Sequence, residues 1–396
     1  METQNRRDFL RQLALGSGAL IAAPDLIAES LTNLSTKKDN IKNNLPCWRG
    51  FNALDFFRPE HYSRLKDSND VTSDDDLKWM ADWGFDFLRI PIAYPSYLKF
   101  DSNKENRHIT PEEVMVFNRE ALDAVENLVY RANKAGLHVS LNLHRAPGYC
   151  INAGFNEPYN LWNDKEAQQA FNSHWEMWSK RFKNVSSKKL SFDLVNEPLY
   201  KEDMNDQFSP SKMVDGNVYR HIAENALNVI HSISSKRIVI ADGNGGGGVA
   251  VPELVGLNIS QSCRGYFPGF ISHYKASWVY KDPAKAPKIE WPGNVEGKYY
   301  DRNSLVEFYK PWKELINKGV GVHCGECGCF NKTPHPIFLG WMEDLLSVLK
   351  ENNIGWGIWN FRGSFGLLDS GREDVDYEDW HSHKLDKKML RLLQKY

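Results

Sequence analysis

The feature that most constrains the fold is a regular alternation of short apolar runs with longer amphipathic stretches, which begins at Cys47 and continues to the end of the chain. Short apolar runs bounded by turn residues are typical of buried strands in a parallel sheet, and amphipathic stretches are typical of the helices that cover it. Eight candidate strands follow one another at residues 49–54, 85–91, 137–144, 189–195, 236–242, 269–274, 320–326 and 354–360. The helices expected between and after them span residues 74–83, 111–135, 164–182, 216–232, 303–318, 335–352 and 384–395.

No linker interrupts this pattern between residues 46 and 396. Parallel strands joined by right-handed crossovers close most economically into one barrel. The sequence therefore predicts an α/β fold in which residues 46–396 form a single (β/α)8 TIM barrel.

Composition and charge restrict the class of ligand. Aromatic residues make up 12% of the chain, and rings of this kind can line a groove and stack on sugars or bases, although most are expected in the core. The net charge is −2, with 49 basic and 51 acidic residues, so there is no basic field to collect phosphates. Nucleic acid is therefore not expected as the main ligand.

The first 23 residues differ from everything that follows. Arg6 and Arg7 are followed by an apolar, small-residue run, residues 13–23, which is too short to span a bilayer as a stable helix. This pattern is typical of a twin-arginine signal peptide, and an ordinary amphipathic helix is the alternative. We expect residues 1–23 to be removed as a signal, residues 24–45 to be a polar linker, and the protein to be periplasmic or extracellular. No later run is apolar enough to predict a membrane span in the mature protein.

Polar residues stand where the candidate strands end. Asn196 and Glu197 end the fourth strand before Pro198, and Glu326 ends the seventh. In a barrel the carboxyl ends of the strands meet at one mouth, where chemistry is done. Asn-Glu-Pro could also be simple turn chemistry, but a second isolated carboxylate favours a site. Two facing carboxylates are what glycoside hydrolysis requires, one to protonate the leaving oxygen and one to attack or to activate water.

Several short motifs, taken together and in this order, resemble glycoside hydrolase family 5 between Trp48 and Leu393. They are Leu88-Arg89-Ile90-Pro91, Leu143-His144-Arg145-Ala146-Pro147-Gly148, Asn196-Glu197-Pro198, Gly325-Glu326-Cys327-Gly328 and Trp359.

The resemblance implies a retaining mechanism in which Glu197 is the general acid/base and Glu326 is the nucleophile. It also implies that Asn196 holds the sugar 2-hydroxyl and that Arg89 keeps the nucleophile ionised. The remaining residues that it assigns to substrate binding are His144 and His273, which would line the site of cleavage, and Trp359, which would be its stacking floor.

One departure from the family pattern concerns the sixth strand. Family members usually carry a tyrosine two residues after the sixth-strand histidine, where it contacts the nucleophile. Here Lys275 occupies that position relative to His273, and Tyr274 follows the histidine directly. Either Tyr274 contacts the nucleophile after a small shift, or Lys275 has taken over part of the role.

Two other functions remain as alternatives to a secreted retaining hydrolase of β-glucan, mannan or a related polysaccharide or oligosaccharide. A metal-dependent hydrolase would use His144, His273, His323 and Glu326, but strand alternation does not place three histidines together. A carbohydrate-binding barrel without activity would not need both glutamates. The cysteines beside Glu326 have no second pair for a zinc site, so no metal or cofactor is expected. The glycine-rich segment 243–248 lacks a P-loop ending and is expected to be a flexible loop.

Overall fold

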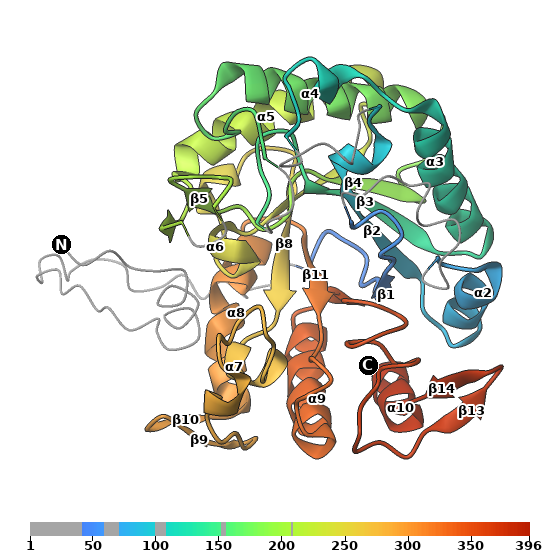
Figure 1. Cartoon of the computed structure of the whole chain (residues 1–396), viewed down its shortest axis with the longest axis vertical. Helices are drawn as coiled ribbons and strands as arrows, with labels where there is room; N and C mark the ends of the chain where they lie inside the picture. Colours follow the sequence, from blue (N-terminus) through green and yellow to red (C-terminus); the bar gives the residue numbers. More distant parts are fainter. Residues whose placement is uncertain (1–41, 59–70, 100–107, 152–155, 207–208) are drawn as a thin grey trace, which may run out of the picture.

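The structure is a computed structural model that describes residues 42–58, 71–99, 108–151, 156–206 and 209–396 (Figure 1). The expected signal peptide, residues 1–23, and all but the last residues of the expected linker, residues 24–45, lie outside the described residues.

Eight parallel strands close into one barrel in the order β1-β12-β11-β8-β7-β4-β3-β2. This confirms the predicted single (β/α)8 barrel. The strands are β1 (Arg49–Asn52), β2 (Phe87–Ala93), β3 (His138–Arg145), β4 (Leu190–Asp193), β7 (Ile238–Asp242), β8 (Ser260–Gly265), β11 (Val322–Cys327) and β12 (Gly355–Ile358).

Helices surround the barrel, as Figure 1 shows, and their ends follow local sequence signals. Ser73 caps the first of them in a capping box with Asp76, and Asp386 caps the last. The longer helices are α2 (Asp74–Asp82), α3 (Arg119–Lys134), α4 (Lys165–Arg181), α5 (Gly216–Ile233), α8 (Arg302–Asn317), α9 (His335–Glu351) and α10 (Lys387–Lys395).

The predicted sixth strand was wrong. Residues 269–272 form a short helix, α7 (Gly269–Ser272), and the sixth barrel strand is β8, which lies nearer the amino terminus. The reason is chemical: β8 carries the buried polar side chains of Gln261, Ser262 and Arg264, so it contains no apolar run. Its polar side chains have buried partners inside the fold, which a search for apolar runs cannot anticipate.

Two boundaries also differ from the sequence prediction. Pro91 was expected to end the second strand, but β2 continues to Ala93, and Pro91 lies opposite Asn142 in the register with β3. The helix predicted from residue 111 begins at Arg119, where the Asn118 side chain accepts a hydrogen bond from the Ala121 backbone. Among residues 111–118 the structure has only a short 3-10 helix (Glu113–Met115).

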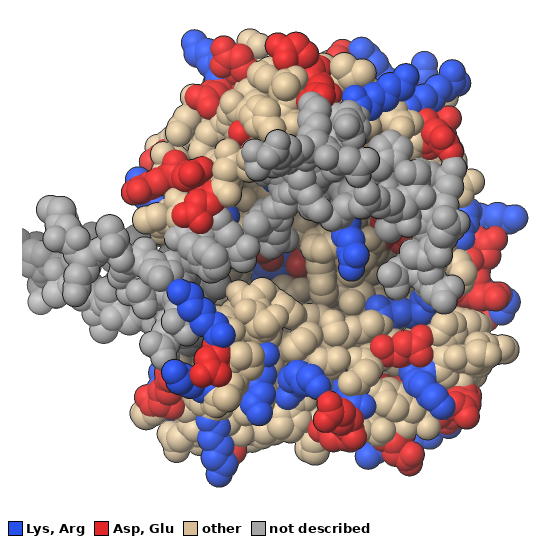
Figure 2. Space-filling model, in the orientation of Figure 1, with Lys and Arg blue, Asp and Glu red and all other residues tan. Residues whose placement is uncertain are grey.

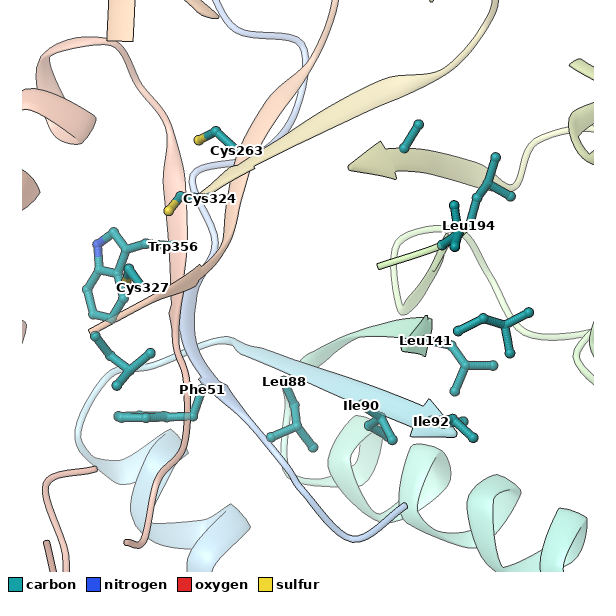
Figure 3. Packing of buried hydrophobic residues seen from close by; sticks show 14 of the residues in the cluster. Phe51, Leu88, Ile90, Ile92, Leu141, Leu194, Cys263, Cys324, Cys327 and Trp356 are labelled. Carbon is teal, nitrogen blue, oxygen red and sulfur yellow. The ribbon is translucent and has the colours of Figure 1, made fainter. Parts of the chain in front are cut away.

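Apolar side chains pack on the outer side of the strands. Figure 3 shows Cys263, Cys324 and Cys327 gathered near Trp356, while Leu88 and Ile90 lie along β2. All six cysteines are free thiols. Among the described residues, no helix is long and apolar enough to cross a membrane.

Three two-stranded antiparallel sheets lie outside the barrel among the described residues. They pair β5 (Tyr200–Lys201) with β6 (Ser211–Lys212), β9 (Gly293–Val295) with β10 (Lys298–Tyr300), and β13 (Glu378–Trp380) with β14 (His383–Leu385).

Candidate active site

A β-bulge on β11 directs Glu326 into the barrel. Cys324 lies opposite Cys263 on β8, but the next pair is Glu326 with Arg264, so Gly325 is an extra residue on β11. A Cβ atom on Gly325 would lie 2.7 Å from the Ser262 hydroxyl oxygen, so a larger residue there would displace the Ser262 side chain. The Glu326 side chain is consequently buried at the barrel mouth.

Arg89, on β2, is fully buried beside Glu326. Its Nη1 donates to Glu326 Oε1 at 2.5 Å, and its Nε donates to Asp193 Oδ2 at 2.8 Å. Its Nη2 donates to Asn196 Oδ1 at 2.9 Å. One guanidinium thus fixes the position of Glu326 relative to the end of β4.

Glu197, just after β4, is held in an unusual backbone conformation. Its φ is 48°, a left-handed value that costs energy for a residue other than glycine. The backbone N–H of Glu197 donates to Asp242 Oδ2 at 2.9 Å, and its carbonyl accepts from the Tyr149 hydroxyl at 2.6 Å. A strained backbone conformation that neighbouring hydrogen bonds hold in place is typical of functional sites.

Burial, together with the charge of the neighbouring Glu326, raises the pKa of Glu197 to about 7 against the opposing effect of Arg264. A carboxyl group with such a pKa can carry a proton near neutral pH, as a general acid must.

Several buried polar atoms in the described part of the barrel lack a hydrogen-bond partner, and two of them belong to predicted site residues. Among the described residues, His144 Nδ1 and Asn196 Nδ2 are buried without a hydrogen bond. Burial lowers the pKa of His144 well below its usual value, so the ring is neutral, and its Nδ1 lies 4.0 Å from Glu326 Oε1. Buried polar atoms without a partner are costly, so a hydroxyl-rich ligand is a natural complement.

Aromatic rings adjoin these atoms. Trp359, at the end of β12, lies with its ring centroid 5.5 Å from that of His144 and 5.3 Å from that of Phe57. In the orientation of Figure 1, the space-filling view in Figure 2 shows a hollow near the centre of the molecule with acidic and basic side chains inside it.

The tyrosine next to Glu326 is Tyr266, which the sequence analysis missed. Its hydroxyl lies 3.3 Å from Glu326 Oε2. Tyr274 instead packs against the hydrophobic core, with the Lys275 ammonium 5.2 Å from its ring centroid. His273 follows α7 rather than ending a strand, and its ring centroid lies 4.9 Å from that of Tyr266. Burial lowers the pKa of His273 to about 4.

Arg264, on β8, was also missed. It contacts Glu197, Asn196, Asp242 and Glu326. The family pattern places a tyrosine two residues after the sixth-strand histidine, and here Tyr266 follows Arg264 by two residues, with an arginine in place of the histidine. Searching for the tyrosine rather than the histidine would have found them.

The ligand set of the metal hypothesis does not come together. His323 Nε2 lies 3.3 Å from the carbonyl oxygen of Trp48, which precedes β1, so this histidine is at the opposite end of the barrel from Glu326. Within the part of the chain that the structure describes, no group of three His, Cys, Asp or Glu side chains could hold a metal ion.

Residues 48–364 match the family model described as Cellulase (glycosyl hydrolase family 5). The chain belongs to glycoside hydrolase family 5. It is therefore a glycosidase, an enzyme that hydrolyses O-glycosyl bonds. The family match and the endoglucanase relatives below support a polysaccharide with β-glycosidic bonds as its substrate.

Similar proteins agree with this membership. Endoglucanase C of Acetivibrio thermocellus is 24% identical over 362 residues, which are 85% of this chain and 95% of the relative. Cellodextrinase A of Ruminococcus flavefaciens is 21% identical over 77% of this chain and 83% of its own length. A solved glycoside hydrolase structure is 35% identical with a TM-score of 0.76 and covers 88% of this chain and 98% of its own.

Proposed function

We propose that this family 5 enzyme is a retaining hydrolase that cleaves a β-linked glucan, with mannan or a related glycan as the alternative substrate. The observation that carries the proposal is that Glu197 and Glu326, at the carboxyl ends of different strands, both contact the guanidinium of Arg264. Two carboxylates at a barrel mouth can perform both steps of a double displacement.

In the first step Glu197 donates its proton to the leaving glycosidic oxygen while Glu326 attacks the anomeric carbon. The raised pKa of Glu197 supports its role as the acid. Arg89 supports the role of Glu326, because its donated hydrogen bond holds the attacking carboxylate in place at the barrel mouth. In the second step Glu197 takes a proton from water, which attacks the anomeric carbon and releases Glu326.

The other residues at the mouth would bind the sugar at the cleavage point. Asn196 Nδ2 is a buried donor in need of an acceptor, which fits a sugar 2-hydroxyl. His144 and His273 would line the same subsite, and Trp359 would provide an apolar floor for the ring. Tyr266 replaces Tyr274 as the tyrosine that touches the nucleophile.

Exposed aromatic rings and the endoglucanase relatives support a β-linked glucan as the substrate. The Trp278 side chain is 51% exposed, and its ring adjoins those of Phe330, Phe365 and His273, which makes a surface for stacking further sugars. The relatives include endoglucanases and a cellodextrinase. A mutant form of the Thermotoga maritima endoglucanase Cel5A, 21% identical with a TM-score of 0.63, has been crystallised with cellobiose, and another structure of Cel5A contains mannotriose.

A polysaccharide panel with proton NMR of the products tests the proposal. We expect hydrolysis of a soluble β-linked glucan, with the β-anomer of the new reducing end appearing before mutarotation. First appearance of the α-anomer would overturn the retaining mechanism. Binding of a glycan without cleavage would favour the inactive carbohydrate-binding barrel instead.

We also propose that the protein is exported through the twin-arginine route to the periplasm or beyond. The paired Arg6 and Arg7 before an apolar run support this proposal. We expect that Arg6→Lys with Arg7→Lys keeps the full chain in the cytoplasmic fraction of a bacterial host, while the unchanged chain appears outside the cytoplasm. The twin lysine variant reaching the periplasm as efficiently as the unchanged chain would refute this route.

A further inference from the structure

Arg264 lies between the two carboxylates. Its Nε donates to Glu197 Oε1 at 2.9 Å, and its Nη2 lies 3.3 Å from Glu326 Oε1. The same Nη2 donates to Asn196 Oδ1 at 2.8 Å. Arg264 is 3% exposed, so these contacts are shielded from solvent.

The surrounding structure is shaped for this side chain. Asp242 accepts from both terminal nitrogens of Arg264, and the Ser262 hydroxyl accepts from Nη1 at 3.1 Å. Gly247, with φ of 82°, makes room for the arginine stem, because a Cβ there would lie 2.6 Å from Arg264 Cγ. The glycine-rich segment, expected as a flexible loop, is thus an ordered turn that accommodates the arginine.

Arg264 also places a different type of ionisable group beside Glu197 from the one in the family pattern. The family pattern has a histidine two residues before the tyrosine that contacts the nucleophile, and here Arg264 precedes Tyr266 by two. Histidine can be neutral at neutral pH, whereas an arginine in a protein stays charged. The neighbour of Glu197 is therefore a permanent cation.

Ionisable groups surround Glu197 and its partners from several strands, and Glu326, Arg264 and Asp242 act on the protonation of Glu197 most directly. The surrounding groups are Glu326 on β11, Asp242 on β7, Arg264 and Tyr266 at and after β8, Arg89 on β2, Asp193 on β4, His144 and Tyr149 at and after β3, and His273 after α7. Asp242 and Glu326 favour the protonated form of Glu197, and Arg264 favours the ionised form.

We propose that Arg264 is a positioning residue that holds Glu197 and Glu326 in fixed relation and lowers the pH above which hydrolysis declines. This proposal rests on the acid/base and nucleophile roles proposed above for the two glutamates. Arg264 acts through them, since its donors are already engaged by protein acceptors.

The contacts of Arg264 suit the two chemical steps differently. Before the first step, Arg264 opposes protonation of Glu197, and its hold on Oε1 leaves Oε2 to carry the proton to the leaving oxygen. Once the Glu326 oxygen is bonded to the anomeric carbon, that carboxylate has lost its charge. Arg264 then stabilises the ionised Glu197, which must accept a proton from water.

The test compares pH profiles of kcat/KM on a soluble glucan for the wild type, Arg264→Lys and Arg264→Gln. Loss of the cation should move the upper limb of the profile of Arg264→Gln to higher pH, by about one unit, as expected when a carboxylate loses an adjacent opposite charge. Arg264→Lys keeps a charge and should keep the limb near its wild-type position, but lower kcat because lysine cannot hold both carboxylates in one plane.

Arg264→Gln removes the guanidinium that donates to both oxygens of the buried Asp242 carboxylate. The double variant Arg264→Gln with Asp242→Asn removes both members of this buried pair and so protects the fold. Arg237→Gln is the matched control. Arg237 is also buried, but it precedes β7 at the other end of the barrel and donates to the carbonyl of Leu190. Its loss should lower the thermal midpoint without moving the pH profile.

A carbon-13 NMR titration of labelled glutamate, with Glu197 assigned from Glu197→Gln, gives a second measure that needs no turnover. The proposal predicts a higher Glu197 pKa in the double variant than in Asp242→Asn alone. An unchanged pKa in folded protein would overturn it. If the wild type cleaves no glycan, the proposed function fails, while the titration still decides whether Arg264 holds Glu197 ionised.

Discussion

Glu326→Gln should abolish turnover while leaving the barrel folded. An amide cannot form the glycosyl ester, so we expect kcat on a soluble glucan to fall by about 10⁴-fold or more, the order seen when a covalent nucleophile is removed from other hydrolases. The substrate should still bind, because Asn196, His144 and Trp359 are unchanged. Initial rates, together with affinity measured by calorimetry, check both parts.

The fold should tolerate this substitution because the charge cluster has more acids than bases. Arg89 also pairs with Asp193, and Arg264 also pairs with Asp242 and Glu197. Glutamine keeps an acceptor oxygen for Arg89 Nη1. Each guanidinium therefore retains a carboxyl partner.

Asp386→Asn is the matched control, since Asp386 is a buried carboxylate that pairs with His335 and caps α10. It should lower the thermal midpoint but not kcat. Near-normal turnover in folded Glu326→Gln would remove Glu326 from the role of nucleophile.

Much of the fold followed from apolar periodicity. Seven of the eight barrel strands lie within two or three residues of the predicted runs, because side chains such as those of Leu88 and Ile90 must pack between barrel and helices. The remaining barrel strand, β8, which is the sixth along the chain, could not be predicted from apolar periodicity. Its side chains gain their stability from partners on β7 and β11, such as Asp242, that are distant in the sequence.

The same reason explains what was found and missed at the site. Glu197 and Glu326 were predicted as the catalytic pair because each ends an apolar strand and their motifs are local, and the structure places both beside Arg264. Arg264 and Tyr266 follow no apolar run, and the histidine that anchored the family pattern pointed to His273 instead. The bulge at Gly325, which orients Glu326, depends on the register between β11 and β8, which the sequence of one strand does not contain.

Glu197→Gln should separate the two steps of catalysis by their dependence on the leaving group. On a β-glucan the leaving oxygen needs a proton, so loss of the acid should lower kcat/KM by about 10²–10⁴-fold. On a dinitrophenyl glycoside the leaving group departs without a proton, so kcat/KM should remain within about tenfold of the wild type. Deglycosylation should then limit kcat, because no base activates the water.

The pH profile identifies the group responsible. Glu197 must be protonated in the first step, so wild-type kcat/KM on glucan should fall as the pH rises through about 7, the pKa to which burial raises this carboxyl group. Glutamine does not titrate, so this decline should be absent from the residual activity of Glu197→Gln, while Asp386→Asn should keep it. A variant that showed the wild-type decline would assign the acid to another group. The unusual φ of Glu197 and its two backbone hydrogen bonds make such a substitute unexpected, since they aim this one carboxyl group at the mouth of the barrel.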